Sequence, residues 1–210
     1  MADTDNMDKF KELPEEKQAA ILTAALKSFA KHGYRKASMN DIAMAAHISK
    51  ALLFHYFGTK KDLYAYLIEH CKRVILGGID FDRIFAVDDF FERLRLGTEL
   101  KIARLKKYPY VFQFAVSALS ETDEEVKNEK NRLMWENDKN FLNALQPKHT
   151  AQFKKGVDIS LVVRIISLVA DGYAATAMSD ENLDFDGLFD ELNRIYDFFK
   201  KHLYKEGEEA

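Results

Sequence analysis

The chain has 210 residues, of which 47% are hydrophobic and 31% are charged, so it can form a packed core and we do not expect wholesale disorder. It has nine glycines and three prolines, about half the usual share, which argues against a many-stranded sandwich or barrel and favours a series of helices. The formal net charge of −3 predicts no particular partner by itself, and the single cysteine, Cys71, allows no intramolecular disulfide, which suits a reducing cytoplasm.

The first residues carry little that could be buried. Residues 1–12 are polar and acidic, so we expect them to form a mobile tail and not a signal peptide. No apolar stretch along the chain reaches the roughly 18 residues that a membrane span needs. We therefore expect a cytoplasmic protein that has no membrane partner.

A helix with one apolar side is expected over residues 14–32. Pro14 suits the first turn of a helix, where its missing N–H costs nothing. Apolar residues then repeat at helical spacing from Ile21 to Phe29. Gly33 follows as a typical C-terminal stop.

Three hydroxyl residues predict where the next helices begin. Ser38 and Thr59 are each followed three residues later by an aspartate, a spacing that resembles a capping box, in which two side chains satisfy each other's backbone donors. Ser49 can cap the helix between them. The expected helices cover residues 38–47, 50–56 and 59–76, and Gly77-Gly78 ends the last of them.

Longer helices are expected in the remainder of the chain, around a polar loop at 147–157. They cover residues 88–107, 109–119, 124–144, 158–179 and 186–204. The sequence thus predicts an all-α fold of about nine helices.

The short helices carry the functional signal. Residues 38–57, SMNDIAMAAHISKALLFHYF, predict two short helices separated by a tight turn, with longer helices before and after them. The second short helix of such a pair lies in the major groove of DNA, about 12 Å wide, with its first turn facing the base edges. Three alanines in the first short helix allow the backbones to approach closely: Ala43, Ala45 and Ala46.

The charge distribution agrees with a nucleic-acid partner. Residues 27–73 contain nine lysines and arginines and three acidic residues, a formal charge of +6, whereas the rest of the chain carries −9. A basic segment on an acidic protein is what attraction to phosphates requires. On charge alone, an ordinary solvated helical surface is an equally good interpretation.

Residues 15–65 resemble the N-terminal domain of TetR-type (tetracycline-repressor family) transcriptional regulators. The motifs that carry the resemblance are Gly33-Tyr34, Ser38, Asp41-Ile42-Ala43, Ser49-Lys50, Phe54-His55-Tyr56-Phe57 and Lys60-Lys61-Asp62-Leu63. The resemblance implies a helix-turn-helix DNA-binding domain at 13–60, a connecting helix at 61–76, and an effector-binding and dimerisation domain at 77–210. It also implies a homodimeric, non-enzymatic repressor that a small effector releases from its operator.

The family's DNA-contact positions correspond here to Ser38, Lys50, Ala51, Leu52, Phe54, His55, Tyr56 and Lys60. Lys50 can donate to guanine edges or to phosphate, and Ala51 and Leu52 can touch thymine methyl groups. His55 and Tyr56 can donate to phosphates, and Lys60 begins a helix whose N-terminus also attracts phosphate. Leu53 and Phe57 are expected to face inward.

Three positions depart from the family pattern. His47 stands where glycine is usual in the turn, which adds backbone strain. Leu52 stands where a small hydroxylated residue is common, and Phe54 replaces a common tyrosine, so a phosphate hydrogen bond is lost. These changes leave the module intact, but the operator sequence does not follow from the resemblance.

The C-terminal part is rich in aromatic residues and would bind a small apolar or amphipathic effector, as the resemblance implies. The pocket candidates are Phe112, Phe114, Trp135, Phe141 and Tyr173, although ordinary core packing is the better interpretation of each one taken singly. The segment LVVRIISLVA at 161–170 and the last helix would form a four-helix bundle with a second copy. The interface candidates are Val163, Ser167, Ala170, Leu192, Ile195 and Phe199; the alternative is the core of a monomer.

Two other classes of function remain open from the sequence. One is a DNA-binding protein of the same fold that has no effector, such as a nucleoid-type structural protein. The other is a helical enzyme, for which the sequence offers no Ser-His-Asp order, no glycine-rich phosphate loop and no paired carboxylates in a metal-binding frame. We expect no enzymatic activity, no cofactor and no metal site.

Overall fold

The computed structural model of the protein describes residues 4–129, 146–177 and 184–206. Within these ranges it contains ten α-helices and no β-strand, with one isolated β-bridge between Phe153 and Tyr204. The predicted all-α fold is confirmed. The described residues fall into two compact units, one formed within 1–77 and 108–134 and the other within 78–107 and 135–210. No helix in the described ranges has the length and apolar character to cross a membrane.

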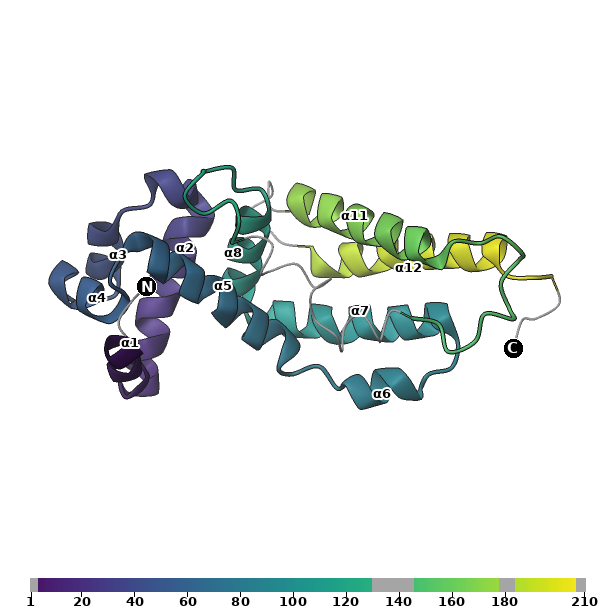
Figure 1. Cartoon of the computed structure of the whole chain (residues 1–210), viewed down its shortest axis with the longest axis horizontal. Helices are drawn as coiled ribbons and strands as arrows, with labels where there is room; N and C mark the ends of the chain where they lie inside the picture. The colour runs from purple at the N-terminus through teal and green to yellow at the C-terminus, as the bar shows by residue number, and fades with distance from the viewer. Residues whose placement is uncertain (1–3, 130–145, 178–183, 207–210) are drawn as a thin grey trace. The chain divides into compact units, whose positions relative to one another are not determined.

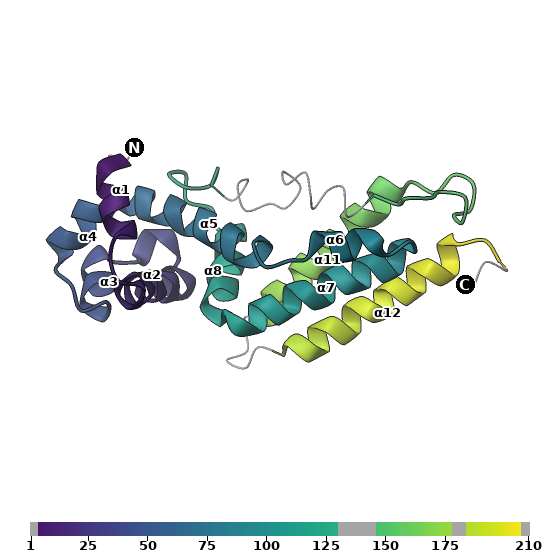
Figure 2. The ribbon, with the colours of Figure 1, turned by 90° about the horizontal axis from the view of Figure 1, so that it is seen from below.

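The first unit is built around a long central helix (Figures 1 and 2). Its helices are α1 (Thr4–Lys11), α2 (Glu15–Lys36), α3 (Met39–Ala45), α4 (Lys50–Phe57), α5 (Lys60–Leu76) and α8 (Pro109–Leu119). α2 packs along α8 and also contacts α3 and α5, while α4 is held between α1, α3 and α5. The two short helices α3 and α4, and the longer helices α2 and α5 before and after them, are those that the sequence predicts.

The three predicted N-terminal caps are confirmed. The side chains of Ser38, Ser49 and Thr59 accept hydrogen bonds from the backbone N–H three residues later, at 3.3, 3.1 and 3.0 Å. The Thr59 hydroxyl also donates to the Asp62 carboxylate at 2.7 Å. Because each cap fixes where its helix begins, these three residues determine the first residues of α3, α4 and α5.

The predicted stop at Gly33 is a break within α2. Gly33 has φ 68° and ψ 174°, and the helical turn resumes after it up to Lys36. A residue with a side chain would be strained at this φ, so glycine is required at the break. Pro14 precedes the first residue of α2 as its N-cap, which agrees with the expected start.

The expectation of a mobile N-terminal tail is wrong for Thr4–Lys11, which form α1. Phe10 is fully buried in the first unit, so this segment does contribute to the core. A single aromatic residue in a charged stretch gives no periodic signal, which is why the sequence pattern does not reveal it.

The expected single domain over 77–210 does not form one compact unit, because residues 108–129 pack with the N-terminal helices. Of the helix expected over 124–144, residues 124–129 form hydrogen-bonded turns and are not helical, and residues 130–144 lie outside the described residues.

The second unit contains α6 (Phe81–Ala86), α7 (Phe90–Lys107), α11 (Ile159–Ala177) and α12 (Phe185–Leu203). The short helix α6 was not expected from the sequence. The core of this unit joins α7, α11, α12 and the loop before α11 through Phe90, Phe91, Leu94, Phe153, Val162, Ile166, Leu192, Tyr196 and Tyr204.

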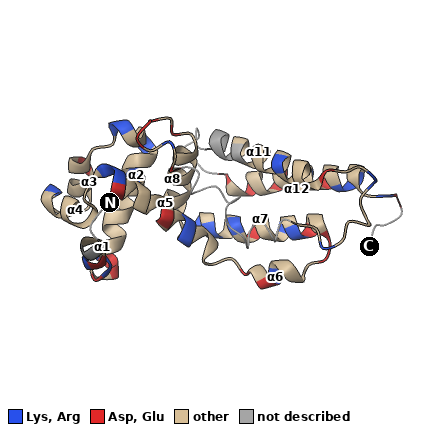
Figure 3. Cartoon of the chain, in the orientation of Figure 1, with Lys and Arg blue, Asp and Glu red and all other residues tan. Residues whose placement is uncertain are grey.

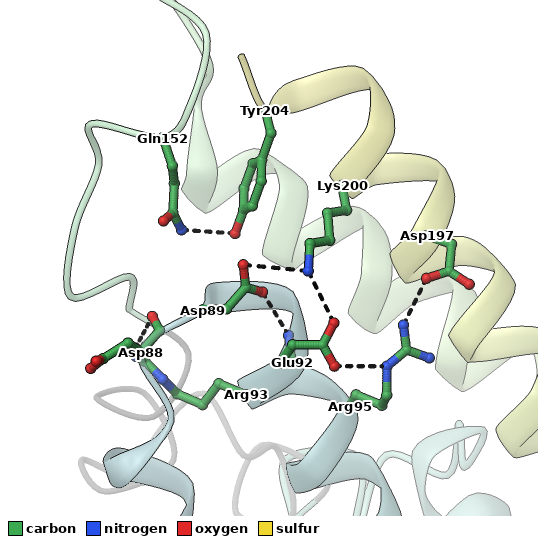
Figure 4. A network of polar contacts seen from close by, with 9 residues as sticks. All are labelled: Asp88, Asp89, Glu92, Arg93, Arg95, Gln152, Asp197, Lys200 and Tyr204. Carbon is green, nitrogen blue, oxygen red and sulfur yellow. Dashed lines mark hydrogen bonds and ion pairs between the residues drawn. The ribbon is translucent and has the colours of Figure 1, made fainter. Parts of the chain in front are cut away.

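A chain of ion pairs also joins α7 to α12 (Figure 4). Lys200 lies 3.0 Å from Glu92 and 3.5 Å from Asp89, and Arg95 bonds both Glu92 and Asp197. The buried Arg93 donates to the backbone carbonyls of residues 87, 88 and 146, so its guanidinium ties the loop before α7 to the chain before α11.

Candidate nucleic-acid interface

The helix α4 has one buried side and one exposed side. Leu53 and Phe57 are fully buried, as predicted, and α4 contacts α3, whose Ile42 and Ala43 are also buried. The opposite side carries Lys50, Ala51, Phe54 and His55, all of which are exposed. A short helix fixed by its inner residues can therefore present these four side chains outward.

The turn between α3 and α4 bears out the expected strain at His47. This residue has φ 55°, and it is the one non-glycine residue with positive φ in the described ranges. The Ile48 N–H donates to the Ala43 carbonyl at 3.0 Å and closes the turn. Histidine adopts this conformation at an energetic cost, since a β-carbon is crowded there.

The remaining predicted contact residues differ in how far they reach solvent. Ser38 and Leu52 are half-buried, and the Ser38 hydroxyl caps α3. Tyr56 is only 7% exposed, with its ring packed edge-on against Phe10 at a centroid distance of 5.9 Å. Only the small exposed part of Tyr56 could touch DNA, so most of its side chain supports α4.

Lys60 is turned toward the protein's own backbone. Its ammonium donates to the carbonyl of Arg35 at 3.2 Å and to that of Ala37 at 3.4 Å. It also lies 4.5 Å from the centroid of the Tyr34 ring. The side chain that the sequence assigns to a phosphate is thus engaged in joining the end of α2 to the start of α5.

The positive charge of this segment is distributed over three helices (Figure 3). α2 carries Lys27, Lys31, Arg35 and Lys36, α4 carries Lys50, and α5 carries Lys60, Lys61, Lys72 and Arg73. Of these, Lys50 lies at the first turn of the exposed side of α4, where a base edge would meet it.

Three of the five pocket candidates lie in the described residues, and they are divided between the two units. Phe112 and Phe114 are buried in the first unit, and Phe114 packs against Phe29 and Tyr64 at centroid distances of 6.2 and 5.2 Å. Tyr173 lies in the second unit and donates its hydroxyl to Glu191 at 2.8 Å. Trp135 and Phe141 lie outside the described residues.

The interface candidates belong mostly to the second unit's own core. Leu192 is buried in it, and Val163, Ala170, Ile195 and Phe199 pack against it, while Ser167 is half-buried. Large apolar residues of α11 that are exposed include Leu161, Ile165 and Leu168, with exposed fractions of 53%, 38% and 63%. These residues are spaced at four and three positions and share one side of the helix.

Comparison with known proteins assigns this site to a family. Residues 21–67 match the model of the bacterial regulatory proteins, tetR family. The transcriptional repressor Rv3405c of Mycobacterium tuberculosis is 36% identical over 100 residues, which cover 45% of this chain and 50% of that protein. The repressor SCO4008 of Streptomyces coelicolor is 39% identical over 56 residues, or 27% of this chain and 29% of that protein. The chain therefore spans half or less of the length of these curated relatives.

Solved structures of the same fold cover more of the chain. A TetR-like regulator from Rhodococcus sp. RHA1 aligns with a TM-score of 0.65 at 18% identity, covering 88% of this chain and 96% of that one. The regulator FadR from Bacillus subtilis, solved in complex with stearoyl-CoA, aligns with a TM-score of 0.64 at 20% identity, covering 84% and 96%. At these identities the likeness concerns the fold.

The family match covers the two short helices α3 and α4, and the solved structures share the helical fold. The N-terminal segment at 21–67 is similar to the bacterial regulatory proteins of the tetR family. The relatives and structural neighbours named above are regulators and not enzymes, which agrees with the expected lack of an enzymatic activity.

Proposed function

We propose that the protein is a cytoplasmic transcriptional regulator that binds operator DNA as a homodimer, represses transcription and is released by a small effector. The observation that carries the proposal is the exposed side of α4. Lys50, Ala51, Phe54 and His55 point outward from a short helix that Leu53 and Phe57 anchor in the core. A lysine and apolar groups on the first turns of such a helix can bind guanine edges and thymine methyl groups.

Repression is supported by the names of relatives, since Rv3405c and SCO4008 are both described as repressors. FasR of Mycolicibacterium smegmatis, 29% identical over 85 residues, is named an activator. A reporter gene placed behind the operator separates the two: repression predicts higher expression when the protein is deleted, and activation predicts lower expression.

The effector that we propose is apolar or amphipathic. The stearoyl-CoA bound to the Bacillus subtilis structure is a ligand of this kind in a protein of the same fold. Coupling between effector and DNA sites of about 1–3 kcal/mol would lower DNA affinity roughly 5- to 150-fold. A protein that binds its operator equally well with and without long-chain acyl-CoA and fatty acids would be a regulator without an effector of this class.

We propose that the dimer forms through the exposed apolar side of α11. Leu161, Ile165 and Leu168 would be covered by a second copy, because a row of large exposed apolar side chains favours association. Leu168→Glu should convert a dimer into a monomer in sedimentation at micromolar concentration, whereas Lys155→Glu, on an exposed loop residue, should leave the dimer intact. A wild-type monomer would contradict the proposal.

Selection of bound duplexes from a random DNA pool tests the proposed function directly. A dimer of this kind should enrich two inverted half-sites separated by about one helical turn. Enrichment of no sequence, with binding that depends only on salt, would instead support a structural DNA-binding protein.

A further inference from the structure

The helix α1 lies outside the segment that matches the family, yet it contacts α4 directly. Phe10 is 0% exposed, and its ring centroid lies 4.8 Å from that of Phe57 and 5.6 Å from that of Tyr66. The same ring packs edge-on against Tyr56. One side chain of α1 therefore touches two residues of α4 and one of α5.

The position of α1 is fixed by further contacts. The Gln18 amide of α2 donates to the backbone carbonyls of Lys11 and Leu13 at 2.9 and 2.8 Å. These bonds hold the end of α1 against the start of α2. A helix of eight residues has little stability of its own, so α1 keeps its shape through these bonds and the buried Phe10 ring.

The helix α4 also has eight residues and depends on its neighbours for its position. α3 and α5 contact it, and α1 supplies a third contact at Tyr56 and Phe57. The Tyr56 ring lies 5.8 Å from the ring of His55, which is on the exposed side. A displacement of the Phe10 ring would therefore displace Tyr56 and, through it, the outward-facing His55.

We infer that α1 is part of the DNA-binding unit and that Phe10 is a positioning residue, which sets the placement of α4 for sequence-specific DNA binding. This inference rests on the proposed function. The placement of α4 affects sequence-specific binding most, because base contacts need accurate geometry. Nonspecific attraction to phosphates tolerates a small shift of the helix.

The test compares Phe10→Ala with Ile75→Ala, a matched loss of a buried side chain at the far end of α5. Anisotropy titrations use two duplexes of equal length: the one recovered by selection from a random pool, and a mixed-sequence duplex. We expect Phe10→Ala to bind the selected duplex about 5- to 150-fold more weakly, the effect of losing one base contact, and the mixed-sequence duplex as the wild type does. Ile75→Ala should bind both as the wild type does.

Phe10→Leu keeps an apolar side chain and serves if Phe10→Ala fails to fold; it should show a smaller loss in the same direction. Hydrogen exchange of the Leu53 and Phe57 amides reads the state of α4 without DNA, and it should speed up in the Phe10 variants more than in Ile75→Ala. Equal losses in Phe10→Ala and Ile75→Ala, or no loss in either, would overturn this inference alone. A wild-type protein that binds neither duplex would overturn the proposed function as well.

Discussion

The Glu121 carboxylate accepts a hydrogen bond of 2.7 Å from the backbone N–H of Tyr34, a residue 87 positions earlier in the chain. Its other oxygen accepts from the N–H groups of Thr122 and Asp123, each at 2.9 Å. Tyr34 follows the break in α2 at Gly33 and precedes the helix-turn-helix. Glu121 thus joins the loop after α8 to the segment from which α3 starts.

Replacing Glu121 with alanine should leave the Tyr34 N–H without this acceptor. We expect the free energy of unfolding to fall by about 1–3 kcal/mol, the typical cost of losing a partly buried hydrogen bond to a charged group. The Tyr34 amide should also exchange its hydrogen faster. Glu124→Ala is the control, since that carboxylate pairs with Lys127 and is 81% exposed. An unchanged rate of amide hydrogen exchange at Tyr34 in Glu121→Ala would show that Glu121 does not hold the Tyr34 backbone in solution.

Lys60→Met removes the ammonium and keeps the apolar stem. Because the ammonium contacts two backbone carbonyls and the Tyr34 ring, we expect the free energy of unfolding to fall by about 1–2 kcal/mol. The salt dependence of DNA binding should stay as in the wild type. A phosphate ligand would contribute about 0.9 per chain to the slope of log K against log salt concentration. A loss of that size would assign Lys60 to a phosphate contact after all.

His47→Gly should stabilise the protein. At φ 55° a histidine costs about 1–2 kcal/mol that glycine does not, part of which is offset by the greater freedom of glycine in the unfolded chain. We expect a net gain of about 0.5–1 kcal/mol in urea unfolding. His32→Gly, in the regular part of α2, should instead destabilise. A loss of stability in His47→Gly would mean that the imidazole makes a compensating contact.

The stability of the protein should depend on pH through His70. Burial, together with the positive charge of Arg73, lowers the pKa of His70 to about 4. Between pH 6.5 and 4 the unfolded chain therefore binds a proton at this residue that the folded chain does not, so the free energy of unfolding falls as the pH falls. In His70→Gln this part of the dependence should disappear, and in the exposed His32→Gln it should remain. Identical pH profiles in urea unfolding for the wild type and His70→Gln would contradict this assignment.

Local signals in the sequence predicted most of the DNA-binding unit. Ser38, Ser49 and Thr59 start their helices as expected because an N-cap acts over three residues. Leu53 and Phe57 face inward because an eight-residue helix has one buried side. Gly33 and His47, both at positive φ, were singled out by residue type and by the family pattern.

The sequence patterns did not predict contacts between distant segments of the chain. Phe10 is one apolar residue in a charged stretch, and its partners Tyr56 and Phe57 lie more than forty positions later. The contact between Glu121 and the Tyr34 N–H could not be predicted either, since a carboxylate that accepts from a distant backbone N–H produces no spacing pattern in the sequence. The apolar sequence at 161–170 marked α11 as a packing helix, but which side faces the core follows only from the placement of α7 and α12.

The central claim is that α4 binds specific DNA through its exposed side, and Lys50→Ala tests it most directly. Anisotropy titrations of the selected and mixed-sequence duplexes, for the wild type and for Lys155→Ala as a charge-matched control, give both affinities. Loss of one base contact should weaken binding to the selected duplex by about 1–3 kcal/mol in Lys50→Ala and narrow its preference over the mixed sequence. Equal affinity of Lys50→Ala and wild type for the selected duplex would contradict the assignment of α4 as the DNA-binding surface.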